Sequence, residues 1–169
     1  MTLTEAKKIG SQQGLISVGL GLLSAQLIMT LLIAPTEGII KSFTWLTDIN
    51  YLTNIIVGAL ALLLSGHLYG QLAGKEIIIK KRDHTWVGFK YGMLTLWTGT
   101  FIGSLIGFFD EGFDKIGMHD DPFFDYLFKP LFWVTLFGLI PVLLVGFWFG
   151  RQIKKKGKEK IKHGTQQSV

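Results

Sequence analysis

Residues 86–109, WVGFKYGMLTLWTGTFIGSLIGFF, form an apolar run that is long enough to cross a bilayer, and five glycines are spaced along it. At about 100° per residue, the glycines fall within one narrow sector of a helix, while Trp97 and Phe101 lie on the opposite side. In lipid, close backbone approach and van der Waals packing decide which helix faces meet. We therefore expect the glycine face to contact protein and the aromatic face to contact lipid. The five glycines are Gly88, Gly92, Gly99, Gly103 and Gly107.

The composition extends this interpretation to the whole chain. Of its 169 residues, 49% are hydrophobic and 17% are charged, which is more apolar than a soluble domain of this size needs. A helix needs about 20 residues to cross a hydrocarbon core of about 30 Å. Four segments meet that length, at residues 12–34, 53–73, 86–109 and 126–149. The sequence therefore predicts an all-α, polytopic membrane protein with a single four-transmembrane-helix bundle over residues 1–169.

The distribution of lysine and arginine predicts the orientation. Two precede the first predicted span, four lie between spans two and three, and seven follow span four, whereas the other two loops have one each. The positive-inside rule then places both termini and the basic tail, residues 151–169, in the cytoplasm, and the acidic loop, residues 110–125, outside. We expect a multi-pass protein of the cytoplasmic membrane. The first span lacks a signal-peptide cleavage pattern, so we expect it to be retained.

The same charge distribution bears on partners. The net charge of +5 averages a basic inner face and an acidic outer face, so no nucleic-acid partner is predicted. The basic tail can contact anionic lipid of the bilayer, although its simplest role is to set the topology.

The glycine pattern occurs twice. A shift of 78 positions brings Gly10, Gly14 and Gly21 onto Gly88, Gly92 and Gly99, and a shift of 80 brings Gly66 and Gly70 onto Gly146 and Gly150. We interpret this as two tandem helical hairpins that form a parallel internal repeat. The glycines expected at helix contacts, in a glycine-zipper arrangement, are Gly14, Gly21, Gly66, Gly70, Gly92, Gly99, Gly103 and Gly146.

Polar residues within the predicted spans are few. Gln26 and His67 form the candidate polar site, because His67 is the one imidazole in a span and an intramembrane ionisable group suggests function. The competing interpretation makes His67 a packing residue that Tyr69, Gln26 or a backbone carbonyl satisfies, and we favour it over a ligand or proton role. Lys90 and Lys129 are expected to extend towards the headgroups, the latter with Asp125 one helical turn away.

The outer loop offers a candidate cation site, since hard cations bind clustered carboxylate oxygens. The loop lacks the alternating acidic spacing of an EF-hand, and its apolar residues suggest that it lies against the membrane surface. We therefore favour a structural, solvated loop without a metal. The residues of this candidate site are Asp110, Glu111, Asp114, His119, Asp120 and Asp121.

No enzyme motif is present in the sequence. The predicted spans contain no Asp or Glu, and the chain has no cysteine, no HExxH, no GxSxG and no Walker loop. We expect no catalytic residue and no cofactor. The leading hypothesis is a non-enzymatic accessory or scaffold subunit that acts through helix packing and its charged faces, with a homo-oligomer or another membrane protein as partner. The alternative is a small oligomeric transporter or channel, which would need a polar lining near Gln26 and His67.

Overall fold

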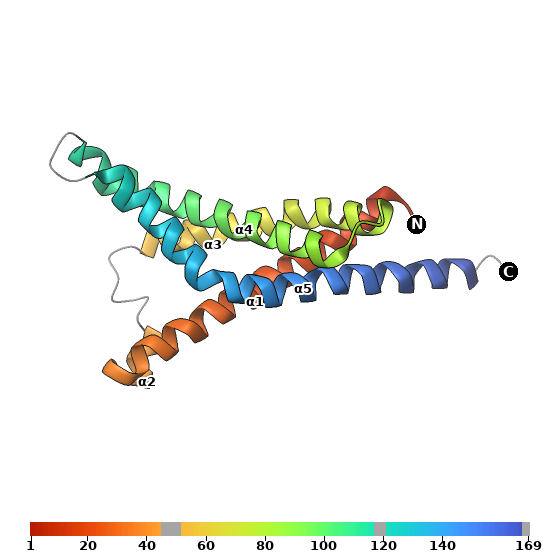
Figure 1. The fold of residues 1–169 in the computed structure, drawn as a ribbon, viewed down its shortest axis with the longest axis horizontal. Coiled ribbons are helices and arrows are strands. Elements are labelled where there is room, and N and C mark those ends of the chain that lie inside the picture. The colour runs from red at the N-terminus through yellow and green to blue at the C-terminus, as the bar shows by residue number, and fades with distance from the viewer. Residues whose placement is uncertain (45–51, 117–120, 167–169) are drawn as a thin grey trace.

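A computed structural model describes residues 1–44, 52–116 and 121–166, and these residues are helical throughout apart from short turns and caps. Four helices are long and apolar enough to cross a membrane: Leu3–Glu37, Leu52–Ile79, His84–Asp110 and Phe124–Lys162. The predicted all-α four-helix bundle is therefore confirmed, and each predicted span lies inside one of these helices. Figure 1 shows both chain termini at one end of the bundle.

The four long helices are α1 (Leu3–Glu37), α3 (Leu52–Gly74), α4 (His84–Gly107) and α5 (Lys129–Gln166). A short helix, α2 (Ile39–Thr44), follows α1, and a π-helical turn, η2 (Lys75–Ile79), extends α3. The connection between α4 and α5 contains three short turns, η3 (Phe108–Gly112), η4 (Phe113–Lys115) and η5 (Phe124–Phe128). The acidic segment 110–125 thus contains helical turns in its described part.

Side chains close in sequence cap the N-termini of the helices. Thr2 and Glu5 form a capping box at the start of α1, and the Asp83 carboxylate accepts a hydrogen bond from the Trp86 amide at 3.0 Å. That hydrogen bond, as the main cause, holds the pKa of Asp83 below its ordinary value. Asp121 accepts from the amides of Phe123 and Phe124 before α5, as its position ahead of Pro122 predicts.

Gly74 is the last residue of α3, but it does not break the helical path of the chain. Its φ of −57° and ψ of −45° are right-handed helical values, and the chain continues through η2. The turn into α4 comes later, where Lys81 has a φ of 52°. The physical reason lies in the contacts of Gly74, which faces the backbone of Ala6 and Gly10 on α1 and is held in the helix by that packing.

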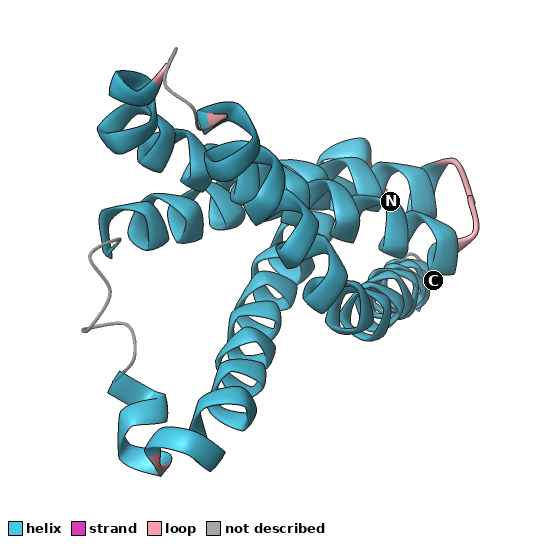
Figure 2. Cartoon of the chain, turned by 60° about the vertical axis from the view of Figure 1, so that its left-hand side comes forward, coloured by secondary structure: helices cyan, strands magenta, loops and turns pink. Residues whose placement is uncertain are grey.

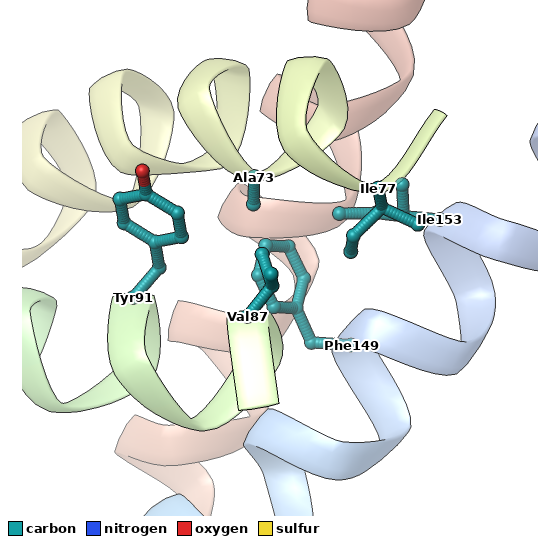
Figure 3. Packing of buried hydrophobic residues seen from close by; sticks show 6 residues of the cluster. All are labelled: Ala73, Ile77, Val87, Tyr91, Phe149 and Ile153. Carbon is teal, nitrogen blue, oxygen red and sulfur yellow. The ribbon is translucent and has the colours of Figure 1, made fainter. Parts of the chain in front are cut away.

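The buried core gathers near the chain termini, in a region that we call the base (residues 3–18, 66–91 and 146–162). Figure 3 shows its side chains meeting from α3, η2, α4 and α5. These residues are Ala73, Ile77, Val87, Tyr91, Phe149 and Ile153. Away from the base, no residue of α1 beyond Val18 is buried, and Figure 2 shows the end of α1, with α2, standing apart from the other helices.

The basic tail is helical as far as Gln166 and packs against the base. Ile153 is fully buried, Gly157 lies against the side chain of Ile78, and Lys160 forms an ion pair with Glu5 at 2.8 Å. This Lys160 contact, assisted by the Thr2 amide, lowers the pKa of Glu5 to about 2. Ile153 and Gly157 are four residues apart, so they share the helix face that packs on η2. Figure 1 also shows a bend within α5, the helix that contains Pro141.

Candidate functional site

Glycines bring α1 and α3 into backbone contact at the base. A side-chain carbon added at Gly10 would overlap the carbonyl oxygen of Gly70, and one added at Gly14 would overlap that of Gly66. On α3, a carbon added at Gly74 would overlap the carbonyl oxygen of Ala6. Because each obstacle is backbone and not a movable side chain, this interface accepts no residue larger than glycine at these positions without moving a helix.

The interface between α4 and α5 is built in the same way. A carbon added at Gly88 would overlap the carbonyl oxygen of Gly146, and one added at Gly150 would overlap that of His84. A carbon at Gly146 would lie 3.1 Å from the carbonyl oxygen of Gly88. Both interfaces therefore place the first turns of one helix against the last membrane turns of the next.

The contacts of the two interfaces correspond residue by residue. Gly10 meets Gly70 and Gly74 as Gly88 meets Gly146 and Gly150. In these contacts, residues of α1 and α4 correspond at an offset of 78 positions. Residues of α3 and α5 correspond at an offset of 76 positions, and not at the 80 used in the sequence comparison. The difference is one helical turn, so helices aligned by spaced glycines alone can slip by four residues and keep a similar match.

Seven of the eight glycines expected at helix contacts do lie against another helix. Gly99 faces the side chain of Leu62, and a carbon added at Gly103 would lie 3.2 Å from the Cα of Gly58, so the glycine face of α4 contacts α3 as well as α5. Gly21 is the exception, because a carbon added there would have no atom within 4 Å. This corrects its assignment to helix packing: α1 has left the bundle by that point, and Gly21 faces open space.

That open space is a cleft of about 800 Å³ lined by all four long helices. Gly14, Gly66 and Gly146 line its closed end at the base, while Asn54, Asp125 and Tyr126 line it at the opposite end of the bundle. Aliphatic and aromatic side chains form most of the wall in between, including Leu22, Leu62, Val134 and Phe137.

Three hydroxyl groups in the middle of the cleft do not present hydrogen-bond donors to it. Ser17, Thr95 and Thr100 each donate to the carbonyl oxygen four residues earlier in their own helix, at 2.8 Å in every case. This is the common way in which a helix satisfies a hydroxyl side chain in apolar surroundings. The cleft therefore offers apolar contact along most of its length.

His67 and Gln26 are not brought together, and neither lines the cleft. His67 is exposed and lies 2.7 Å from the Ser11 hydroxyl through Nδ1 and 2.8 Å from the Gln71 amide nitrogen through Nε2. If the Gln71 amide donates to Nε2, then Nδ1 carries the proton and donates to Ser11. The ring thus links α1 to α3 by a side-chain partner, Ser11, that sequence reasoning did not name.

Gln26 has a different and local role. Its amide nitrogen donates to the carbonyl oxygen of Ser42 at 3.1 Å and to the Thr30 hydroxyl at 3.3 Å. Because Ser42 belongs to α2, these bonds fold α2 back against α1. The two members of the candidate polar site therefore serve separate contacts in the described chain.

A charged cluster at the base was missed by sequence reasoning. The Tyr91 hydroxyl donates to the Glu76 carboxylate at 3.2 Å, and Arg82 and Lys90 lie 3.2 and 3.9 Å from the same oxygen. The Glu76 side chain is only 12% exposed. Glu76 follows the predicted span 53–73, and the helix that continues through η2 to Ile79 brings its side chain beside Tyr91. A prediction that extended this helix to Ile79 would have indicated the contact.

One further buried polar group stands out in the base. Gln13 is 1% exposed, and its amide nitrogen has no hydrogen-bond partner within the described residues. It lies on α1 one residue before Gly14, close to the tightest part of the bundle.

At the other end of the bundle, Lys129 forms an ion pair with Asp125, as expected from their spacing of four residues.

The candidate cation site of the outer loop has no support in the described residues. Among them, no three His, Cys, Asp or Glu side chains are grouped as metal ligands are, and the Asp121 carboxylate caps the helix that follows. His119 and Asp120 lie outside the residues that the structure describes.

No protein family, curated protein or solved structure matches this chain.

Proposed function

We propose that this protein is a non-enzymatic accessory or scaffold subunit of a membrane assembly. The observation that carries the proposal is the continuity of α5, which leaves the glycine-packed base and runs to Gln166 as a lysine-rich helix. Ile153, Gly157 and the ion pair of Lys160 with Glu5 attach that helix to the base. A rigid, basic helix held at a fixed angle is suited to docking on an acidic surface of a partner or on anionic lipid.

The distribution of polar groups supports the same proposal. Gln26, His67 and Glu76 bind neighbours within the fold and do not converge on a common space. A scaffold role requires rigid packing and an exposed charged face, and these groups contribute to rigidity. We place transport second, because most of the cleft wall is apolar and would not replace the hydration shell of an ion or polar solute.

The proposal includes an orientation, with the base and both termini in the cytoplasm. The lysine and arginine distribution supports it, since three basic segments meet at the base. A reporter fused after Gly164 and another inserted at residue 117 test it. Opposite sides of the membrane are expected, and two reporters on one side would contradict the orientation.

We further propose that the chain arose by duplication of a helical hairpin with a glycine-zipper interface. The residue-by-residue match between the α1–α3 and α4–α5 contacts supports this origin. Helices α1 and α4 run in one direction, and α3 and α5 run in the other. Equivalent helices of the two hairpins therefore point the same way, as is required of parallel repeats related by an axis along the membrane normal.

Copurification of the full chain from native membranes tests the scaffold role. The informative variant changes three exposed lysines of α5 to glutamate, and its matched control changes the same three to arginine. These lysines are Lys154, Lys155 and Lys158. We expect an integral membrane protein to copurify at a constant ratio with wild type and with the arginine control, and to be lost from the glutamate variant.

Two other results would count against the proposal. If the glutamate variant kept the same partner at the same ratio, the basic helix would not be the docking element. If the purified chain alone moved a solute across liposomes with saturation, transport would replace the scaffold role. The reporter after Gly164 confirms that each variant keeps its topology.

A further inference from the structure

We propose that the cleft between α1 and the other helices binds the acyl chain of a membrane lipid that enters from the leaflet opposite the base. This site goes beyond the scaffold role and does not depend on it.

The position of the cleft places it at the depth of the hydrocarbon core. Its walls come from the four helices that are long and apolar enough to span a membrane. At the base the glycine contacts of Gly14 with Gly66 close it. Beyond Val18, Leu22 and Leu32 of α1 line the cleft, whereas the exposed Leu23 and Leu27 do not, so α1 forms one wall and the remaining long helices form the others.

The chemistry of the wall selects an apolar occupant. Ser17, Thr95 and Thr100 donate to their own helices, so the middle of the cleft offers dispersion contacts and no free hydroxyl donor from these residues. Apolar cavities do not hold ordered water, and an unfilled one forfeits the dispersion contacts of every atom in its wall. In a bilayer, the apolar molecules that surround the protein are lipids.

The size of the cleft fits a small apolar ligand. The cleft has about 800 Å³. That volume lies within the roughly 300–1,000 Å³ of small-ligand sites, and a thin, flexible hydrocarbon chain can follow an irregular wall.

The polar groups at the far end of the cleft fit the polar end of a lipid. Asn54, Asp125 and Tyr126 line it there, and Asp125 pairs with Lys129. Because this carboxylate and ammonium offset each other, we expect no preference for an anionic headgroup. The chain of the lipid would point towards Gly14 and the base, with its headgroup near Asp125.

Two glycines of α1 give a matched pair of variants. Gly19 and Gly21 both have open space around an added side-chain carbon, and only Gly21 lines the cleft. Gly21→Leu should therefore fill the site without disturbing a helix contact, while Gly19→Leu adds the same side chain on another face of the same helix. Ala25→Leu is a second filling variant, since Ala25 also lines the cleft one turn further along α1.

The experiment uses the full chain in nanodiscs that contain phosphatidylcholine with a photoactivatable diazirine on one acyl chain. After irradiation, peptide mapping compares labelling of cleft residues, such as Ala59 and Leu62, with that of exposed residues, such as Leu23 and Leu64. We expect cleft labelling in wild type and in Gly19→Leu. In Gly21→Leu and Ala25→Leu, the ratio of cleft labelling to labelling of exposed residues should fall by roughly tenfold. This is the change in equilibrium constant that corresponds to the free-energy cost of over-packing one site.

Several results would overturn the inference. Cleft residues without label in wild type would show that no chain enters. An unchanged ratio in both filling variants would show that the labelled chain lies elsewhere. Cleft labelling that falls as more copies of the chain are placed in each nanodisc would identify a second copy as the occupant. Replacing phosphatidylcholine with an anionic lipid carrying the same labelled chain should leave the ratio unchanged, and a strong increase would contradict recognition through the acyl chain.

Discussion

Gly88 of α4 lies so close to the carbonyl oxygen of Gly146 on α5 that no side-chain carbon fits between them. Gly10 of α1 has the same relationship to Gly70 of α3. These contacts join the four helices in pairs at the base, where the buried core also lies (Figure 3). Further from the base, α1 separates from the bundle and the cleft begins.

The first prediction tests these contacts with the smallest available change. Gly88→Ala and Gly10→Ala should each lower stability by roughly 1–3 kcal/mol, because the added methyl meets backbone that cannot move alone. Gly19→Ala, in open space on α1, should be neutral or stabilising by up to about 1 kcal/mol through helix propensity. Thermal melts in detergent measure all three, and an equal shift for the three variants would refute the contact assignment.

The second prediction concerns the Glu76 cluster. Glu76→Ala removes the acceptor of Tyr91 and leaves Arg82 and Lys90 without their carboxylate, so a loss of roughly 1–3 kcal/mol is expected. Tyr91→Phe removes one hydrogen bond and should cost about 1 kcal/mol. Denaturation in a detergent titration gives these values. Hydrogen exchange should show the change concentrated in η2 and the first turns of α4.

The control for this cluster is Glu159→Ala. Glu159 lies 4.0 Å from Lys155, and both side chains are more than half exposed, so its removal should cost under about 1 kcal/mol. If Glu76→Ala were no more costly than Glu159→Ala, the cluster would not stabilise the turn between α3 and α4.

The third prediction concerns docking of the basic helix through Glu5 and Lys160. Glu5→Lys should increase hydrogen exchange in residues 153–162, and adding Lys160→Glu should restore protection by reversing the pair. Because the pKa of Glu5 is lowered to about 2 in the fold, the pair contributes fully above the ordinary glutamate pKa of 4.5 and is lost as the pH falls towards 2. Protection of wild type by this pair should therefore not change between pH 6 and 8. A failure of the double variant to recover would show that Lys160 is not the partner that matters.

The fourth prediction separates structure from function at His67. His67→Ala removes hydrogen bonds to Ser11 and Gln71 on an exposed surface, so the cost should be about 1 kcal/mol or less. Copurification of a membrane partner should be the same as for wild type. Loss of the partner in a stable His67→Ala protein would assign His67 a functional role, contrary to the packing interpretation.

Much of the fold could be predicted from local sequence. Residues 86–109 are long, apolar and marked by glycines at helical spacing, and each of these properties depends on neighbours within the same helix. Asp83 and Asp121 likewise act on amides two or three residues away, so their capping roles follow from position alone. Which glycines face protein was also predictable for α4, where all of them share one sector.

The contacts between helices could not be predicted, because they depend on the distance between the helices at each position. Gly14 and Gly21 lie two helical turns apart on the same face of α1, so the sequence does not distinguish them. Only Gly14 contacts another helix, because α1 diverges from α3 between the two glycines. Glu76 contacts Tyr91 because the helix continues past Gly74, where Gly74 packs on the backbone of Ala6. Such contacts join residues distant in the chain, so no local pattern encodes them.

The sequence by itself therefore determined four apolar helices, their caps and the glycine faces available for contact, because these depend on length, hydropathy and a period of 3.6 residues. The tertiary structure alone decided which glycines meet, the register of 76 positions between α3 and α5, and the opening of the cleft. The physical reason is that spaced glycines permit close approach along a whole helix face, while the helices can touch along only part of their length once one of them diverges.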